Sequence, residues 1–264
     1  MSEEKSGGGI SLVTKSKFSA PENFFPIVVD DFFSDPEDLV NYGKSLPKEP
    51  ATDGRWPGNR SKPLWEIDEV LHNVIMSKIM SCYYDLDYIE ISWKHANLVF
   101  QEIPRFSENK NDIRNKGWIH RDVPGEDQLA GLIYLTPNID PDSGTSLYNI
   151  KSTRFNKKQV SKFKLLKTIT SFFSGDSFDR EEYTKNYIKH EENFFEKLRV
   201  RNIFNRLIAY DTREWHRANS FYNGDGEDAR LMLVFFIGGI NVFPLKRIRN
   251  NEYETLIKLQ IGKK

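Results

Sequence analysis

The part of the chain after residue 83 constrains the fold most, because short apolar segments follow one another there with few helical patterns between them. These segments are rich in aliphatic and aromatic residues and are separated by residues that form turns. A chain with this texture is expected to fold as a β-sandwich or barrel, with helices from the N-terminal half packed onto it. The predicted strands are residues 88–93, 96–103, 129–136, 205–210 and 231–237.

The N-terminal half carries the helical patterns. Residues 24–33 read as a first strand, and the next segment has the features of a helix start, with Ser34 as the N-cap and Pro36 in the first turn. This helix is predicted to run through Leu46. A second helix is predicted over residues 66–80, because apolar residues recur there at helical spacing.

Segments without an apolar period divide the chain. Residues 1–20 are expected to be a flexible arm, residues 21–245 the folded domain and residues 246–264 a C-terminal extension. The charged segment 151–192 is interpreted as an insertion with one or two helices. This insertion and the connection 53–62 are long and polar, so both are expected to flank the functional site and to select the substrate.

Composition excludes several classes of function. The 38 basic and 38 acidic side chains cancel, so no net field draws the chain to nucleic acid or to a membrane surface. Cys82 is the only cysteine, and no segment approaches the roughly 18 apolar residues of a membrane span. The first residues lack the basic and apolar regions of a secretory signal. A cytoplasmic protein is expected, and the basic run 151–167 is interpreted as a solvated surface.

Two histidines and one aspartate point to a metal site. Alternate residues of a strand project to the same face, so His120 and Asp122 can bind one ion. His216, from a distant strand, would complete the facial triad of non-haem Fe(II) oxygenases, which leaves coordination positions open for substrate and O2. A polar pair on a strand surface is the alternative interpretation of His120 and Asp122.

The order of these motifs resembles that of the Fe(II)/2-oxoglutarate-dependent dioxygenases, and among them the prolyl-4-hydroxylase-like branch. The resemblance covers residues 24–238, from a strand and helix through His-x-Asp and a Tyr-Leu strand to the distal His and Arg. It implies a mainly β fold with flanking helices around a double-stranded β-helix (jelly roll, cupin-like), with His120, Asp122 and His216 as iron ligands. Segments 56–60 and 204–210 are similar to an uncharacterised bacterial and phage-type subgroup.

The same resemblance assigns the residues that bind the co-substrate. Arg230 would pair with the far carboxylate of 2-oxoglutarate through its guanidinium fork, and Tyr134 would add a hydroxyl group. The spacing from His216 to Arg230 is longer than is usual in the family, and Met232 stands where many members have Ser or Thr. An edge charge for Arg230 and an ordinary buried tyrosine for Tyr134 are the alternative interpretations.

The implied activity is that of a hydroxylase that uses Fe(II), 2-oxoglutarate and O2 and releases succinate. Its substrate would be a peptide of the prolyl type or a small molecule. A non-catalytic metal-binding or assembly protein on the same fold is the alternative, although Asp122 and Arg230 favour an enzyme. His120, Arg121 and Asp122 also spell the catalytic-loop triplet of protein kinases, but Asp127 replaces the loop asparagine and no Asp-Phe-Gly follows.

The residues around these motifs complete the predicted site. Trp118 and Trp215 flank the metal motifs and are predicted to wall the iron pocket. The remaining histidines, His72, His95 and His190, are interpreted as solvated or capping residues rather than ligands.

Overall fold

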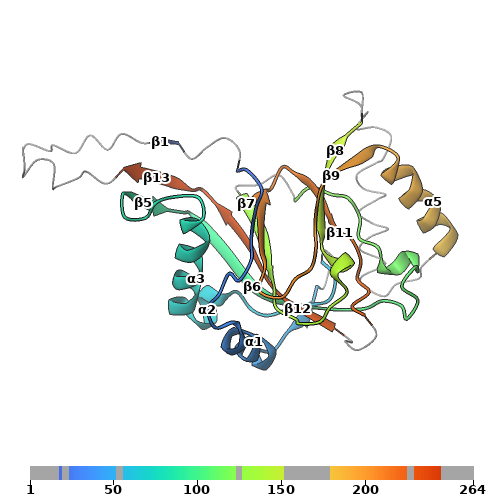
Figure 1. Ribbon diagram of the computed structural model, residues 1–264, viewed down its shortest axis with the longest axis horizontal. Helices are drawn as coiled ribbons and strands as arrows, with labels where there is room; N and C mark the ends of the chain where they lie inside the picture. The colour runs from blue at the N-terminus through green and yellow to red at the C-terminus, as the bar shows by residue number, and fades with distance from the viewer. Residues whose placement is uncertain are drawn as a thin grey trace, which may run out of the picture.

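Two antiparallel sheets that face each other form the centre of the molecule in a computed structural model, which describes residues 18–19, 24–51, 56–122, 127–151, 179–224 and 229–244 (Figure 1). Side chains of both sheets meet in one buried cluster that includes Leu147, Val200, Met232 and Val234. The larger sheet has the spatial order β2 (Ile27–Val29), β10 (Leu207–Asp211), β7 (Asp127–Tyr134), β12 (Ala229–Gly238), β6 (His95–Pro104), β4 (Asn59–Arg60) and β3 (Glu49–Pro50). The smaller has the order β11 (Trp215–Ala218), β8 (Thr145–Ile150) and β9 (Phe194–Val200).

The chain passes back and forth between these two sheets. Strands β6, β7, β10 and β12 belong to the larger sheet, and β8, β9 and β11 belong to the smaller one. His120, which lies between β6 and β7, joins the smaller sheet through an antiparallel bridge with His216 of β11. Each layer therefore has four strand segments, which alternate between the layers along the chain except at the consecutive pair β8 and β9; this is the topology of a double-stranded β-helix. The predicted mainly β, jelly-roll fold class is confirmed.

The apolar run of β12 is explained by burial on both faces of the larger sheet. Leu231, Leu233, Phe235 and Ile237 belong to the cluster beneath the helices, whereas Met232 and Val234 point into the cluster between the two sheets. Successive residues of a strand alternate between faces, so a strand covered on both sides reads as continuously apolar.

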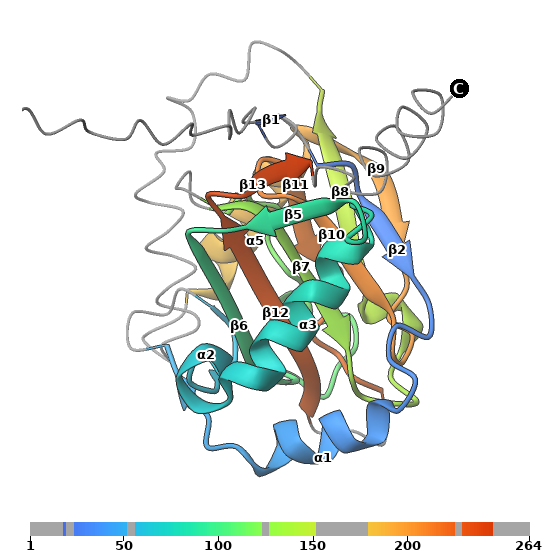
Figure 2. The same cartoon turned by 90° about the vertical axis from the view of Figure 1, so that its left-hand side faces the viewer.

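Three helices from the N-terminal half cover the outer face of the larger sheet. They are α1 (Pro36–Ser45), α2 (Leu64–Ile67) and α3 (Glu69–Ser81), and α3 lies across the strands in Figure 2. Ile75, Met76 and Ile79 of α3 are buried in the same cluster as Leu98 and Phe100 of β6. Helix α5 (Arg180–Glu191) lies on the opposite side of the molecule, beside the smaller sheet (Figure 1).

The predicted helix over residues 66–80 is two helices, because Asp68 is not helical. Asp68 has φ −156° and ψ 82°, and its side chain accepts a hydrogen bond from the backbone N–H of Leu71. Asp68 thus caps α3. The predicted N-cap Ser34 is also wrong, since Asp35 occupies that position and Pro36 begins α1.

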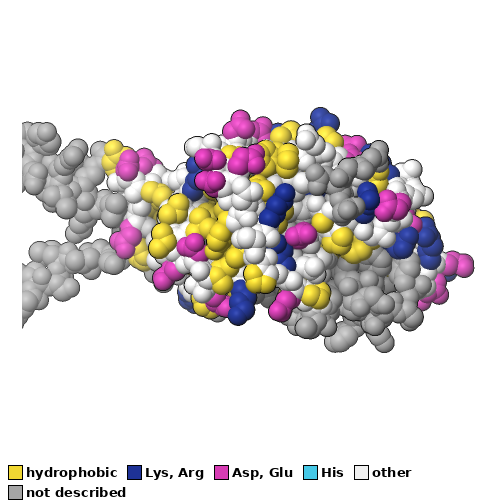
Figure 3. All heavy atoms as spheres, turned by 90° about the horizontal axis from the view of Figure 1, so that it is seen from below, with side chains coloured by type: hydrophobic (Ala, Val, Ile, Leu, Met, Phe, Trp, Pro, Cys, Tyr) yellow, Lys and Arg dark blue, Asp and Glu magenta, His cyan; other side chains and the backbone are white. Residues whose placement is uncertain are grey.

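The remaining elements are short. A second three-stranded sheet joins β1 (Phe18–Ser19), β13 (Asn241–Pro244) and β5 (Ile89–Ser92), and 3-10 turns occur at η1 (Ile113–Asn115) and η2 (Pro141–Ser143). The first predicted strand, residues 24–33, is reduced to β2. Figure 3 shows the underside of the molecule, where acidic, basic and hydrophobic side chains are interspersed among the described residues.

Several predictions concern residues outside the described ranges. Most of the N-terminal arm, the extension 246–264 and residues 152–178 of the insertion belong there. The described part of the insertion ends in α5, which confirms one helix within it. Among the described residues, no helix is long and apolar enough to cross a membrane.

Candidate metal centre

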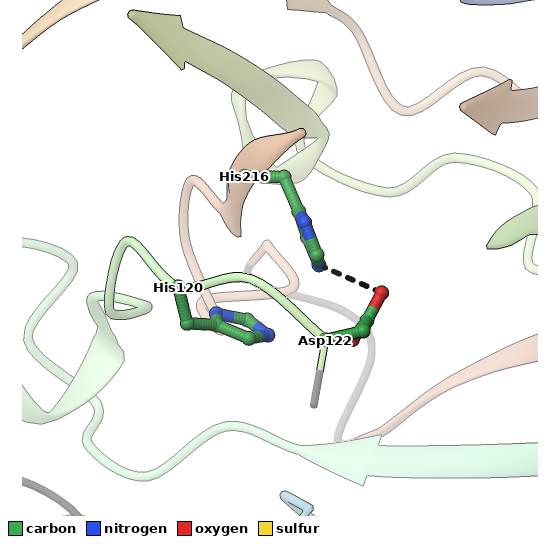
Figure 4. Close-up of side chains that lie close together, drawn as sticks. All are labelled: His120, Asp122 and His216. Atoms are coloured by element: carbon green, nitrogen blue, oxygen red, sulfur yellow. Dashed lines mark ion pairs between the residues drawn. The ribbon is translucent and has the colours of Figure 1, made fainter. Parts of the chain in front are cut away.

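The two histidines of the predicted triad are brought together by the backbone. The N–H of His120 donates to the carbonyl of His216 at 2.9 Å, and the N–H of His216 donates to the carbonyl of His120 at 2.8 Å. This reciprocal bridge places the two imidazole ring centroids 4.4 Å apart. Asp122 follows two residues after His120, and all three side chains converge in Figure 4.

The three side chains can face a single ion. Their candidate ligand atoms all lie within 4.8 Å of one another, and His216 Nε2 lies 3.7 Å from Asp122 Oδ2. Metal bonds to nitrogen and oxygen are about 2.0–2.2 Å long, so small side-chain movements would bring the three atoms onto one ion. Two imidazoles and one carboxylate on one side leave the other coordination positions open.

Hydrogen bonds fix the tautomer of both histidines. Nδ1 of His120 lies 2.8 Å from the carbonyl of Trp118, and Nδ1 of His216 lies 3.0 Å from the carbonyl of Glu214. A carbonyl can only accept, so each Nδ1 carries the proton and each Nε2 keeps its lone pair for a metal. Burial lowers the pKa of His216 to about 4, although the Asp122 carboxylate opposes that shift, so the ring is neutral at pH 7.

Asp122 supplies a further sign that a cation belongs here. Its Oδ2 is buried and accepts no hydrogen bond. A buried carboxylate oxygen without a partner is costly, and a divalent ion would satisfy it. The donor set of His120, Asp122 and His216 therefore fits a first-row divalent metal.

A buried arginine lies at the start of β12, on the inner face of the larger sheet. Arg230 is 2% exposed, and its Nη1 donates to the carbonyls of Ser143 and Ser220, each at 2.7 Å. Its buried Nε has no hydrogen-bond partner. Burial lowers the pKa of Arg230 to about 10, so the guanidinium stays charged at neutral pH. Arg230 is therefore not the exposed edge charge of the alternative interpretation.

Two hydroxyl groups accompany Arg230. The Tyr134 hydroxyl lies 2.8 Å from Thr145 Oγ1, and both residues are buried. Burial raises the pKa of Tyr134 to about 12, while the charge of Arg230 acts in the opposite direction, so the two groups are close enough to interact. The structure thus brings Arg230 and Tyr134 together, and it adds Thr145, to which the sequence analysis gave no role in binding.

Two other arginines near His216 are already paired with acids. Arg213 donates to Asp211 through Nε and Nη2, at 2.8 Å each, and Arg217 pairs with Glu191 and donates to the Tyr187 hydroxyl. Arg230 differs from both, since no carboxylate among the described residues forms an ion pair with it. It is the better candidate for an external anion.

Helix α5 supports the segment that carries His120. The indole N–H of Trp118 donates to the Tyr183 hydroxyl at 2.5 Å, and His190 Nε2 lies 2.7 Å from the carbonyl of Ile119. His190 and His72 are both buried, so neither is solvated, and neither belongs to the candidate metal group, in agreement with the interpretation that they are not ligands. The helix therefore holds Trp118 and Ile119, the two residues that precede His120.

The tryptophans beside the metal motifs do not wall the pocket as predicted. Trp118 packs against Tyr183 and Tyr187 of α5. Trp215 packs against Phe194 of β9. Trp215 precedes His216 on β11 and therefore points to the opposite face of the smaller sheet. Both rings thus serve the outer packing of this sheet.

The profile of a family of unknown function, DUF6445, matches residues 20–237, and no curated protein sequence matches. Among solved structures, the chain is similar to a prolyl hydroxylase of Trichoplax adhaerens in complex with a peptide fragment of hypoxia inducible factor, at 14% identity and a TM-score of 0.46, over 81% of this chain and 83% of that one.

Two further structures are similar at comparable distance. HygX of Streptomyces hygroscopicus, with nickel and 2-oxoglutarate bound, is 11% identical, with a TM-score of 0.47 over 81% of this chain and 82% of its own. A viral collagen prolyl hydroxylase of Paramecium Bursaria Chlorella virus-1 is 10% identical, with a TM-score of 0.36 over 84% and 91%. At these identities the similarity concerns the course of the chain, and the ligands of those proteins are not transferred by it.

Proposed function

Since the chain belongs to the DUF6445 family, whose function is unknown, we propose from the geometry of its site that it is an Fe(II)- and 2-oxoglutarate-dependent oxygenase, and most specifically a hydroxylase. One observation carries the proposal: two imidazoles converge with a carboxylate whose buried Oδ2 accepts no hydrogen bond, in the same jelly roll that buries an arginine without a carboxylate partner among the described residues. A metal and a dicarboxylate are the two ligands that this arrangement fits.

His120, Asp122 and His216 would hold the metal. The Nδ1 hydrogen bonds to Trp118 and Glu214 keep both rings oriented before a metal arrives, so less freedom is lost on binding. When bound, Fe(II) with O2 and 2-oxoglutarate supplies the oxidising power, and the co-substrate is decarboxylated to succinate.

Arg230 and Tyr134 would bind the far carboxylate of 2-oxoglutarate. The two backbone carbonyls that accept from Arg230 Nη1 fix the guanidinium, and its Nε remains available as a donor. The Tyr134 hydroxyl is held by Thr145 and compensates for Met232, which has no hydroxyl group. Fixed donors in a water-poor pocket bind an anion more tightly than the same groups in solvent.

The substrate would be a peptide or a small molecule, because the inner face of the roll offers aromatic and polar side chains to it. Tyr210 packs its ring 4.7 Å from that of His216, and Phe221 lies beneath the Arg230 guanidinium. Both rings are buried. With a single cysteine and balanced charge, we place the enzyme in the cytoplasm.

The test is an anaerobic titration, first with Fe(II) and then with 2-oxoglutarate, followed by visible absorption. Bidentate binding of the co-substrate should give a weak charge-transfer band that saturates at one equivalent. The His120→Ala, His216→Ala double variant is the control and should give no band. Metal binding without any response to 2-oxoglutarate would instead identify a metal-binding or assembly protein on this fold.

A further inference from the structure

A second arginine faces the interior of the roll, close to the metal residues. Arg60 of β4 pairs with Gln101 of β6, Gln101 is opposite Met232 of β12, and Met232 is opposite Tyr134 of β7. Residues directly opposite each other in a sheet point to the same face. The Arg60 side chain therefore lies on the face that carries Tyr134, and Glu49 of β3, which is opposite Arg60, is the last residue of this row.

The segment around Arg60 is held rigidly against β6. Gln101 accepts a hydrogen bond from Arg60 Nε at 3.1 Å and donates to the Pro57 carbonyl at 2.6 Å. Gly58 has φ +68°, and a Cβ there would lie 2.1 Å from the carbonyl oxygen of Glu102, so only glycine permits this contact. The Trp56 ring lies 4.6 Å from the Arg60 guanidinium carbon. The guanidinium is thus oriented before any ligand binds.

The charge of Arg60 is not neutralised by a neighbour. Gln101, its hydrogen-bond acceptor, is uncharged. None of the described carboxylates forms an ion pair with Arg60, including that of Glu49, which is opposite Arg60 on β3 and exposed. Asp122 is close enough for the two charges to interact, yet its buried Oδ2 accepts no hydrogen bond, so the guanidinium does not reach it. Burial lowers the pKa of Arg60 to about 10, which leaves it charged at neutral pH.

We propose that Arg60 binds a carboxylate of the substrate beside the metal, and that the substrate is therefore a small carboxylate such as an amino acid or its acyl derivative. Nε is occupied by Gln101, so the two terminal nitrogens would take the two carboxylate oxygens in a planar, bidentate contact. Arg230, with Tyr134 and Thr145, remains the partner of 2-oxoglutarate. This inference rests on the proposed function, because it assigns the substrate of the same site.

The experiment uses the full chain loaded with Ni(II) and 2-oxoglutarate, which prevents turnover. Twenty N-acetyl amino acids and the twenty matched amides are compared by thermal shift, and the best pair is measured by calorimetry. We expect at least one acid to bind about 10- to 100-fold more tightly than its amide, which is the range for a charged hydrogen bond. A set in which no acid binds more tightly than its amide overturns the proposal.

Variants then assign the preference to Arg60. Arg60→Gln should reduce the difference between acid and amide to within about twofold, and Arg60→Lys should keep part of it. The affinities for Ni(II) and for 2-oxoglutarate should stay unchanged in both. Lys62→Gln removes one positive charge from the same segment at an exposed position and should behave as wild type. An undiminished preference in Arg60→Gln overturns the proposal.

A chemical measurement covers the case in which Arg60→Gln does not fold. Phenylglyoxal modifies accessible guanidinium groups, and mass spectrometry of the wild-type protein reports the rate at Arg60. The best N-acetyl amino acid should slow this reaction, and its amide should not; equal rates contradict the proposal. Because this measurement also works without metal, loss of the Arg60 site is distinguished from failure of the protein to bind Ni(II) and 2-oxoglutarate at all.

Discussion

The two sheets of the roll contribute to one site but are supported in different ways. The outer face of the larger sheet is buried beneath α1 and α3 by apolar side chains such as Phe100 and Phe235. The outer face of the smaller sheet is covered by aromatic rings and directional bonds, among them Trp118 to Tyr183 and Arg217 to Glu191. Apolar packing tolerates small displacements better than hydrogen bonds do. The two histidines, which belong to the smaller sheet, are therefore held by the interactions with the stricter geometry.

The largest effect should come from removing the ligands on the smaller sheet. The His120→Ala, His216→Ala double variant should lose metal affinity by about a thousandfold or more, because only Asp122 remains. The bridge between these residues is made by backbone atoms, so the fold should persist. Metal content by mass spectrometry and circular dichroism measure the two effects. Stoichiometric metal in the double variant would refute the ligand assignment.

Shortening a buried side chain of the larger sheet should have the opposite result, a loss of stability without a loss of metal affinity. Leu233 is fully buried, and Leu233→Ala should lower the free energy of unfolding by about 2–5 kcal/mol. The metal affinity of the molecules that remain folded should not change, since Leu233 points away from the site. Urea unfolding and metal titration decide this. A parallel loss of metal affinity would show that the two sheets are not independent supports.

Variants of Arg230 test whether the start of β12 in the larger sheet binds 2-oxoglutarate. Loss of a buried charged contact should cost about 2–4 kcal/mol, so Arg230→Ala should weaken 2-oxoglutarate binding by roughly 30- to 1000-fold with metal affinity retained. Arg230→Lys keeps the charge but not the fork and should lie between. Arg213→Ala, which removes an exposed arginine paired with Asp211, is the control. Unchanged affinity in Arg230→Ala would show that another group binds the carboxylate.

A smaller effect is expected where α5 meets the smaller sheet. Tyr183→Phe leaves the buried indole N–H of Trp118 without its acceptor and should lower the free energy of unfolding by about 1–2 kcal/mol. Metal affinity should fall by less than about tenfold, because the carbonyl of Trp118 orients His120. Tyr83→Phe, whose hydroxyl bond to Phe25 is exposed, should change neither quantity measurably.

The smallest effect concerns pH. Burial lowers the pKa of His190 below 6.5, so between its folded pKa and 6.5 the unfolded chain binds more protons than the folded one. Stability is full above about pH 6.5 and falls as the pH drops toward the folded pKa, by at most about 1.4 kcal/mol per pH unit. His190→Gln keeps a donor for Ile119 without titrating, and its stability curve should be flatter in metal-free protein. Identical slopes would exclude His190.

The sequence predicts what local patterns encode. The long strands β6, β7, β10 and β12 of the larger sheet, the jelly-roll class and the identity of the three converging side chains follow from apolar runs and from motif order, and the structure reproduces them. The surroundings of these residues do not follow, because they depend on contacts between distant segments. His190 reaches Ile119 only after α5 docks, and Arg60 enters the row of Tyr134 only through pairing of β4 with β6.

Local rules also fail where two of them compete. The apolar spacing of residues 66–80 predicts one helix, but the side chain of Asp68 hydrogen-bonds the backbone of Leu71 and starts a second helix. Similarly, Trp118 and Trp215 stand next to metal ligands in the sequence, and alternation along β11 turns Trp215 to the other face. Nearness in sequence is therefore a poor guide to which side chains share a pocket.

The backbone bridge between His120 and His216 has a consequence for how the chain folds. These residues are separated by almost the whole roll, so their pairing is a non-local contact that forms only after the intervening strands have closed, and such contacts form slowly. A metal bound to both histidines would link the two ends of this long segment and would oppose its unfolding. The unfolded chain, in which the two histidines are far apart, has no comparable place for the ion, so maturation of the site should be a late event during folding.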